Sequence, residues 1–119
     1  MPKYPVPTTV RNIARNAIKE NQALPISQRA AYKDEGGKRV EGTGMRTARR
    51  LVSGAIDEEQ IRLMDAWFAR HGASEMETQK RRDKTSKASR AWRLWGGNAG
   101  RSFVSQMVRK LDKKKRQGE

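Results

Sequence analysis

The sequence predicts a small all-α domain, a compact bundle of four to five short helices with an extended N-terminal arm and a basic C-terminal tail. Three observations lead to this prediction. Apolar residues recur at helical spacing in several separate stretches. Glycine and proline fall between those stretches rather than inside them. No stretch alternates apolar and polar residues convincingly, so we expect no β-strand.

Residues 86–112 are expected to form the centre of the fold as a helical hairpin. Ser86 is a candidate N-cap, because its hydroxyl can accept from a free backbone N–H of the first turn. The double glycine at 96–97 should end this helix, since glycine adopts the left-handed conformation without a steric penalty. Asn98 is the candidate cap of the second helix.

Each helix of this hairpin has an apolar face. The predicted faces contain Ala88, Ala91, Trp92 and Trp95 in the first helix, and Phe103, Val104, Met107, Val108 and Leu111 in the second. We expect Trp92 and Trp95 to be core residues that pack against Phe103 and Met107. The alternative is that these tryptophans, or Trp67, are exposed and stack on nucleic-acid bases.

The N-terminal segment, residues 1–7, holds three of the four prolines and is expected to be an extended arm. Thr8 or Thr9 should begin the first helix. Its predicted buried stripe contains Val10, Ile13, Ala17 and Ile18. Pro25 should end it, because proline has no N–H and disfavours helix in the residue before it.

Two further helices are expected in the middle of the chain. The first covers about 44–53, with Gly54 as its stop. The next begins with Asp57 as N-cap and Gln60 three residues later, which approximates a capping box, and ends at Gly72. Its predicted buried stripe contains Ile61, Met64 and Phe68, with Trp67 beside it.

The remaining segments lack apolar periodicity. Ser27 is a candidate cap for a short helical piece, and residues 33–44 are glycine-rich and charged, which predicts a mobile loop. Residues 73–85 contain almost no apolar side chains and predict a long surface loop. Residues 113–119 predict a basic tail that frays into solvent. The single domain therefore spans residues 8–112.

Composition limits the class of protein. At 34% apolar residues, the chain can build only a small core. It has no cysteine, which excludes disulfides and thiolate metal sites. No apolar run reaches the ~20 residues that span a bilayer, and the N-terminus lacks the apolar region of a signal peptide. We therefore expect a soluble protein, with no membrane partner, that stays in the cell or particle that makes it.

The net charge of +14 favours a polyanionic partner, and duplex DNA above all. Residues 80–119 carry 14 basic and 3 acidic side chains, whereas residues 1–79 carry 13 and 10. The candidate nucleic-acid contacts are Lys80, Arg81, Arg82, Lys84, Lys87, Arg90, Arg93, Arg101, Arg109, Lys110, Lys113 and Lys114. No helix carries a convincing edge of base-reading side chains, so binding without sequence specificity is predicted.

The glycine-rich stretch at 96–100 has two interpretations. It is a tight turn between helices, or its backbone N–H groups, with Arg101 in the following turn, hold a DNA phosphate. It lacks the Lys-Ser/Thr ending of a nucleotide-binding loop.

No catalytic site is predicted. His71 is the only histidine and has no cysteine partner for a metal site or a nucleophile pair. The adjacent carboxylates at 57–59 are explained by the start of a helix, where the helix dipole favours negative charge. We expect no enzyme activity, no metal and no cofactor.

Three stretches together resemble a small helical module of tailed-bacteriophage proteins. They are GMRTARRLVSGA, IRLMDAWFARHGAS and RAWRLWGGNAGRSFVSQMVRKLD, within about residues 44–112. The module combines a helix like ARARDLANG, a helix ending FFARH and a closing AWxLWGGDxGRxWAxxxVRxLD. It occurs alone or appended to head-maturation proteases. Asn98 replaces its usual Asp and Phe103 its usual Trp. The resemblance implies phage origin and a helical fold, but no catalytic residues.

The predicted function is that of a phage-encoded, basic, non-enzymatic protein that binds the DNA backbone. The alternative is a structural component of the virion, bound to the head or capsid, whose charge faces packaged genome or an acidic capsid surface. A third option is a small inhibitor of a host enzyme. The expected location is the host cytoplasm during infection or the virion. Oligomeric state stays open.

Overall fold

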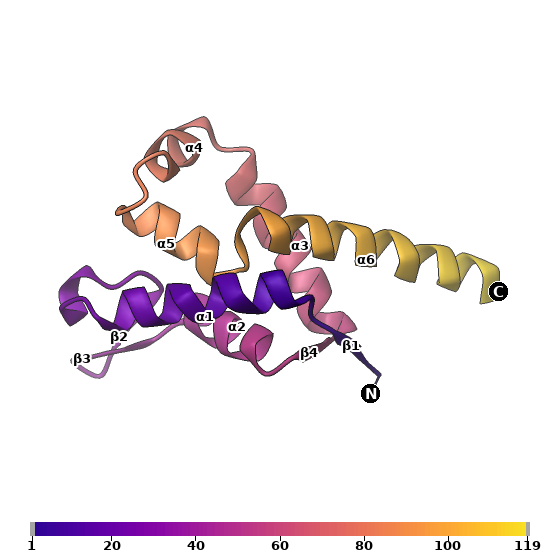
Figure 1. Ribbon diagram of the computed structural model, residues 1–119, viewed down its shortest axis with the longest axis horizontal. Helices are drawn as coiled ribbons and strands as arrows, with labels where there is room; N and C mark the ends of the chain where they lie inside the picture. Colours follow the sequence, from indigo (N-terminus) through magenta and orange to yellow (C-terminus); the bar gives the residue numbers. More distant parts are fainter. Residues whose placement is uncertain (1, 119) are drawn as a thin grey trace.

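The computed structural model describes residues 2–118, and most of them are helical (Figure 1). The elements are β1 (Lys3–Pro5), α1 (Thr8–Gln22), β2 (Tyr32–Glu35), β3 (Lys38–Glu41), α2 (Thr43–Val52), β4 (Ala55–Asp57), α3 (Glu58–Gly72), α4 (Glu75–Arg81), α5 (Lys87–Leu94) and α6 (Gly97–Gly118), with a 3₁₀ turn at Ile26–Gln28. The predicted mainly helical fold is confirmed. The prediction of a purely all-α fold is wrong, because two small sheets are present.

The N-terminal arm is extended, and it is paired rather than free. β1 runs antiparallel to β4, with Lys3 opposite Asp57 and Pro5 opposite Ala55. The backbone N–H of Val6 then donates to the carbonyl of Gly54, and the Val6 side chain is buried. The arm therefore closes one end of the core.

The prediction of a mobile loop at residues 33–44 is wrong, because most of this segment forms the antiparallel β2–β3 hairpin. Gly36 and Gly37 both have positive φ, at 59° and 82°, which suits a tight two-residue hairpin turn. The side chains of β2 beyond Tyr32 are exposed. No face of the hairpin enters the core deeply, so the sequence carries no apolar alternation that would predict a strand.

The segment between α1 and β2 is held by a buried amide. The Asn21 side chain donates to the carbonyl of Ala30 at 2.9 Å and accepts from its N–H at 2.8 Å. Ala31 follows with a φ of 58°, in the left-handed region. The prediction that Ser27 caps a helical piece is wrong, because Ser27 lies inside the 3₁₀ turn, which has no side-chain cap.

Residues 75–81 form α4, so the prediction of a surface loop at 73–85 is wrong for these seven residues. Ser74 caps the helix by accepting from the N–H of Glu77. Glu75 and Glu77 lie in the first turn, where the helix dipole favours negative charge. No residue of α4 is buried, so there is no apolar stripe from which to predict this helix.

The two middle helices confirm the predictions. α2 ends before Gly54, which has a φ of 102°. The Asp57 side chain accepts from the N–H of Gln60 at the start of α3. Gln60 does not complete a capping box, however. Its buried side-chain amide donates to Thr47 and accepts from Arg50, which ties α3 to α2.

Ser86 caps α5 as predicted, accepting from the N–H of Ser89 at 3.1 Å. Gly96 and Gly97 have φ values of 99° and 64°, and a Cβ at Gly96 would lie 2.8 Å from Val10. The prediction that Asn98 caps the last helix is wrong. Asn98 lies inside α6, and its carboxamide oxygen accepts from the indole N–H of Trp92.

Trp92 and Trp95 are buried, which confirms them as core residues. Phe103 and Met107 pack against the same core, but the aromatic rings that meet the two tryptophans come from α3. Trp95 stacks on Trp67 with ring centroids 4.4 Å apart, and Trp92 meets Phe68 edge-on at 4.9 Å. Phe103 makes no aromatic contact with them within the described residues and stays half-buried at the edge of the core.

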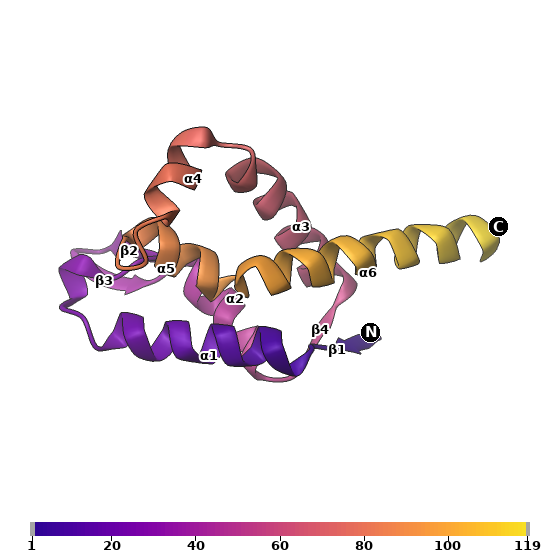
Figure 2. The same cartoon turned by 45° about the horizontal axis from the view of Figure 1, so that its top comes forward.

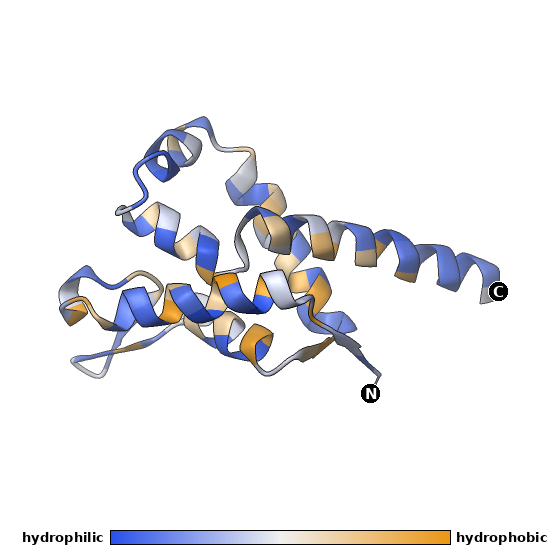
Figure 3. Cartoon of the chain, viewed as in Figure 1, coloured by the Kyte–Doolittle hydropathy of each residue, from blue (hydrophilic) through white to orange (hydrophobic). Residues whose placement is uncertain are grey.

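α6 is one long helix, so the prediction that residues 113–119 fray is wrong as far as Gly118. Its first half packs on α1 and α3, and Leu111 is its last buried residue. The rest extends beyond the other elements (Figures 1 and 2) and lengthens the molecule to 50 Å. This extension is almost entirely hydrophilic (Figure 3).

Candidate nucleic-acid interface

The predicted contacts lie in two groups rather than in a single patch. Nine of these basic side chains are exposed. One group, on or near α4 and the start of α5, contains Lys80, Arg82, Lys84 and Lys87; the other, on α6, contains Arg101, Arg109, Lys110, Lys113 and Lys114. Figure 1 places α4 and the end of α6 at opposite sides of the molecule. A continuous interface over all twelve residues is therefore not formed.

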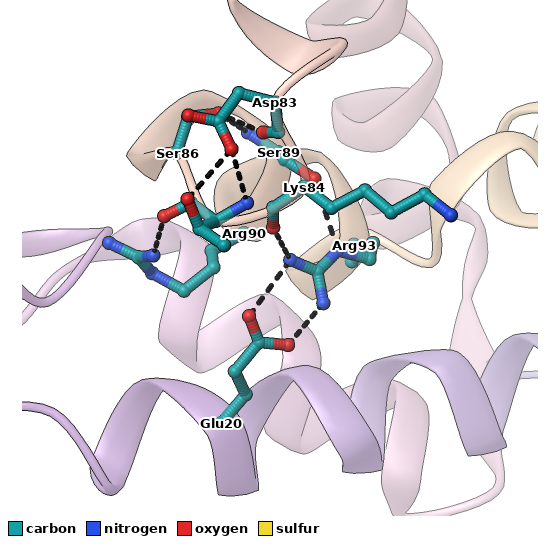
Figure 4. Close-up of polar contacts among 8 residues, drawn as sticks. Glu20, Asp83, Lys84, Ser86, Ser89, Arg90 and Arg93 are labelled. Atoms are coloured by element: carbon teal, nitrogen blue, oxygen red, sulfur yellow. Dashed lines mark hydrogen bonds and ion pairs between the residues drawn. The ribbon is translucent and has the colours of Figure 1, made fainter.

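Arg90 has a structural role, which does not fit its prediction as a DNA contact. Its side chain is only 5% exposed. The guanidinium donates to the carbonyl of Thr85 (Figure 4). It also donates to the carbonyl of Gln28, so it joins the start of α5 to the segment after α1. Arg90 therefore has no surface to offer a phosphate.

Arg93 is also bound to other parts of the protein. Its guanidinium forms a two-pronged ion pair with Glu20 of α1 and donates to the carbonyl of Lys84 at 2.8 Å (Figure 4). The hydrogen bond from Arg93 lowers the pKa of the Glu20 carboxyl, although partial burial acts in the opposite direction. The charge of Arg93 is therefore largely neutralised within the fold.

Arg81 lies flat on the core. Its guanidinium carbon is 3.9 Å from the centre of the Trp92 ring, and it donates to the carbonyl of His71 at 3.2 Å. Burial lowers the pKa of Arg81; the carboxylate of Glu77 raises it, and the positive charge of Arg101 lowers it further. This arginine caps the end of α3 and stabilises the tryptophan through a cation–π contact.

The exposed side of α6 carries polar residues that were not predicted as contacts. They are Asn98, Ser102, Ser105 and Gln106, which lie beside Arg101 and Arg109 along a shallow groove. Their helical spacing is visible in the sequence and could have indicated this face, but only the apolar face of the helix was predicted. No carboxylate occurs on α6 before Asp112, and Asp112 pairs with Arg62 at 2.8 Å.

The glycines at 96–100 are explained by close packing. All but Asn98 and Ala99 in this stretch are buried. A Cβ at Gly100 would lie 2.5 Å from the carbonyl oxygen of Trp95. These contacts support the tight-turn interpretation over a phosphate cradle.

A cavity of about 270 Å³ lies between α3, α4 and α5 and is lined by Trp67, Trp92, Trp95, His71 and other residues. Trp67 is flanked by the Trp95 and His71 rings, each with its centroid 4.4 Å away. The tryptophans thus stack on neighbours rather than on bases. His71 contacts the Glu77 carboxylate through Nδ1 at 2.8 Å.

Among the described residues, no group of three acidic, histidine or cysteine side chains is arranged to hold a metal ion. Within residues 2–118, no helix combines the length and apolar character needed to cross a bilayer. Comparison with protein-family models, curated proteins and solved structures found no match to this chain. The geometry of the exposed cations therefore carries the functional argument.

Proposed function

We propose that this chain is a phage-encoded basic protein that binds duplex DNA through the phosphate backbone, without sequence specificity and without enzymatic activity. Phage origin rests on the sequence resemblance described above. DNA binding rests on charge, and one observation carries it: the exposed cations of α6 have almost no acidic partners. Such a protein acts in the host cytoplasm during infection or faces the genome inside the virion.

The charge on α6 is largely uncompensated. Arg101, Arg109, Lys110, Lys113 and Lys114 are exposed, and no ion pair involves any of them within the described residues. Of the helix's other basic residues, Lys115 pairs with Glu58 at 2.7 Å. A row of unpaired cations raises the local concentration of a polyanion, and each phosphate contact releases bound counterions from DNA.

A salt series tests this proposal. If Arg101, Arg109, Lys110, Lys113 and Lys114 each neutralise a phosphate, log K against log salt should have a slope of about −4.5 on duplex DNA. Gel shifts with random and scrambled sequences should give the same curve. Tight binding that ignores salt, or no binding at low salt, contradicts the proposal.

A matched pair of variants locates the phosphate-binding residues. Replacing Lys110, Lys113 and Lys114 with Gln should make the slope shallower by about 2.7, or about 0.9 for each lysine replaced. The control replaces Arg15, Lys19 and Arg46, which are exposed on α1 and α2, with Gln. It removes the same charge, and its slope should stay close to that of the parent. Equal changes of slope in both variants would mean that overall charge, not α6, drives binding.

The virion alternative differs in location and is tested separately. Mass spectrometry of purified particles should find many copies per particle if the chain is a structural component. Absence from particles favours action in the host cytoplasm.

A further inference from the structure

We infer that α6 lies in the major groove of duplex DNA, with its outer face toward the base edges. The outer face is defined by Asn98, Ser102, Ser105 and Gln106. Arg109 and Lys113 continue this line, and their long side chains extend to the phosphates at the edges of the groove. This inference rests on the proposed DNA binding and adds which element enters the DNA and by which groove.

The dimensions of α6 fit this placement. It has 22 residues, so it is about 33 Å long at 1.5 Å per residue. A helix with its side chains is about 10–12 Å across, and the major groove is about 12 Å wide. The outer face is open to a duplex, because Asn98, Ser102, Gln106, Arg109 and Lys113 are exposed. The end of α6 extends beyond the other elements (Figures 1 and 2), although Asp112 and Lys115 still pair with Arg62 and Glu58 of α3.

The chemistry of the outer face suits a groove floor. Ser102 and Gln106 form a hydrogen-bonded pair at 3.2 Å, and Arg109 donates to Ser105 at 3.2 Å. Hydroxyl and carboxamide groups both donate and accept hydrogen bonds. Because Gln106 and Arg109 are bonded to neighbouring serines, they are not free for the two-pronged contacts by which such side chains select one base. This explains how a helix can enter the groove and still bind without sequence specificity. The first carboxylate on the helix, Asp112, is held by Arg62.

Cations flank this face on both sides. Successive residues on a helix point about 100° apart, which places Arg101 on one side of the outer face, and Lys110 and Lys114 on the other. The two phosphate backbones form the walls of the groove, so a central polar stripe with lateral cations matches its cross-section.

The other helices fit the major groove less well than α6. α3 and α4 expose carboxylates that form no ion pair within the described residues, such as Glu59 and Glu75, and phosphates repel these. α1 is packed against α2, α5 and α6. α2 and α5 have no carboxylates, but they contain only 10 and 8 residues. Arg49 of α2 forms an ion pair with Glu41, and Arg93 of α5 forms one with Glu20, so neither arginine is free to bind a phosphate.

A bulky, uncharged substitution tests the placement without changing electrostatics. Gln106→Trp should weaken binding to duplex DNA by about tenfold or more, because the indole keeps the helix from the groove floor. Asn16→Trp, at an exposed position of α1, is the matched control and should bind like the parent. Circular dichroism melting of both variants checks that neither change disturbs folding.

A second arm uses the unaltered protein, so it does not depend on how a variant folds. The probe is a duplex whose cytosines carry glucosylated 5-hydroxymethyl groups, which fill the major groove and leave the phosphates unchanged. Affinity for this duplex should fall by about tenfold or more relative to the unmodified duplex. Equal affinity for both duplexes, together with normal binding by Gln106→Trp, overturns the groove placement while the proposed DNA binding stands. No binding to unmodified DNA at low salt overturns both.

Discussion

Asn21→Ala tests how the chain between α1 and β2 is held in place. Asn21 is fully buried, and its side chain makes both hydrogen bonds that the backbone of Ala30 requires. It also donates to the sulfur of Met45 in α2 at 3.4 Å. A single carboxamide thus joins three segments of the fold.

The expected cost follows from these hydrogen bonds. A buried backbone group left without a partner costs about 1–3 kcal/mol. Alanine at position 21 leaves the N–H and the carbonyl of Ala30 unpaired, and Ala30 is only 4% exposed, so water cannot easily replace the amide. We expect a loss of about 3 kcal/mol from a total of about 5–15 kcal/mol for a domain of this kind.

Urea unfolding followed by circular dichroism measures this loss. Asn16→Ala is the control, because Asn16 lies on the same helix, is exposed and makes no side-chain hydrogen bond within the described residues. Its unfolding free energy should change by less than about 0.5 kcal/mol. If Asn21→Ala costs no more than the control, Asn21 does not hold this segment.

Three further predictions concern the core, the end of α6 and acid stability. Trp92→Ala should cost about 3–5 kcal/mol in urea unfolding, since the ring is 7% exposed; a stable variant would refute its place in the core. Truncation after Asp112 removes one exposed ion pair and no buried side chain, so stability should change by less than about 1 kcal/mol while DNA affinity falls; a large drop in melting temperature would show that this end packs. The hydrogen bond from Arg93 lowers the folded-state pKa of Glu20 below its ordinary value. As pH falls, the unfolded chain therefore takes up the proton first, and stability is lost as pH falls through the folded-state pKa. In the Arg93→Gln variant, the urea midpoint of unfolding should fall less steeply as the pH is lowered. The same fall as in the parent protein would refute the coupling between Arg93 and Glu20.

Most helices were predictable because their ends are encoded locally. Asp57 and Ser86 cap their helices through a backbone N–H three residues away, and Gly54 and Gly96 end helices through positive φ. These interactions lie within a few residues, so residue type and spacing reveal them.

The sheets and α4 were missed for the opposite reason. β1 has three residues, and its partner β4 lies some fifty residues further along the chain, so neither strand has a periodic pattern of its own. The glycine pair at 36–37 is typical of a hairpin turn. The strand residues beside it are mostly exposed and polar, so no apolar pattern indicated a strand there. α4 buries no side chain at all.

For the candidate site, the sequence predicts how many basic residues there are but not which of them are exposed. Arg90 and Arg109 look alike in the sequence, yet one is buried and the other is exposed. The difference depends on partners far away in the chain: Arg90 binds a carbonyl 62 residues distant, and Arg93 binds a carboxylate 73 residues distant. No local pattern contains that information, so buried or paired arginines could not be told apart from exposed ones in the sequence.

The length of α6 connects folding to binding. A helix is costly to nucleate but gains one hydrogen bond for each residue added afterwards. The first half of α6 is fixed by packing on α1 and α3, so residues after Leu111 continue an existing helix. Lysine and arginine are good helix formers, and positive charge near a helix C-terminus is favoured by the dipole. The cations beyond the core are therefore held in an ordered row, and the proposed DNA binding need not bear the full entropy cost of ordering them.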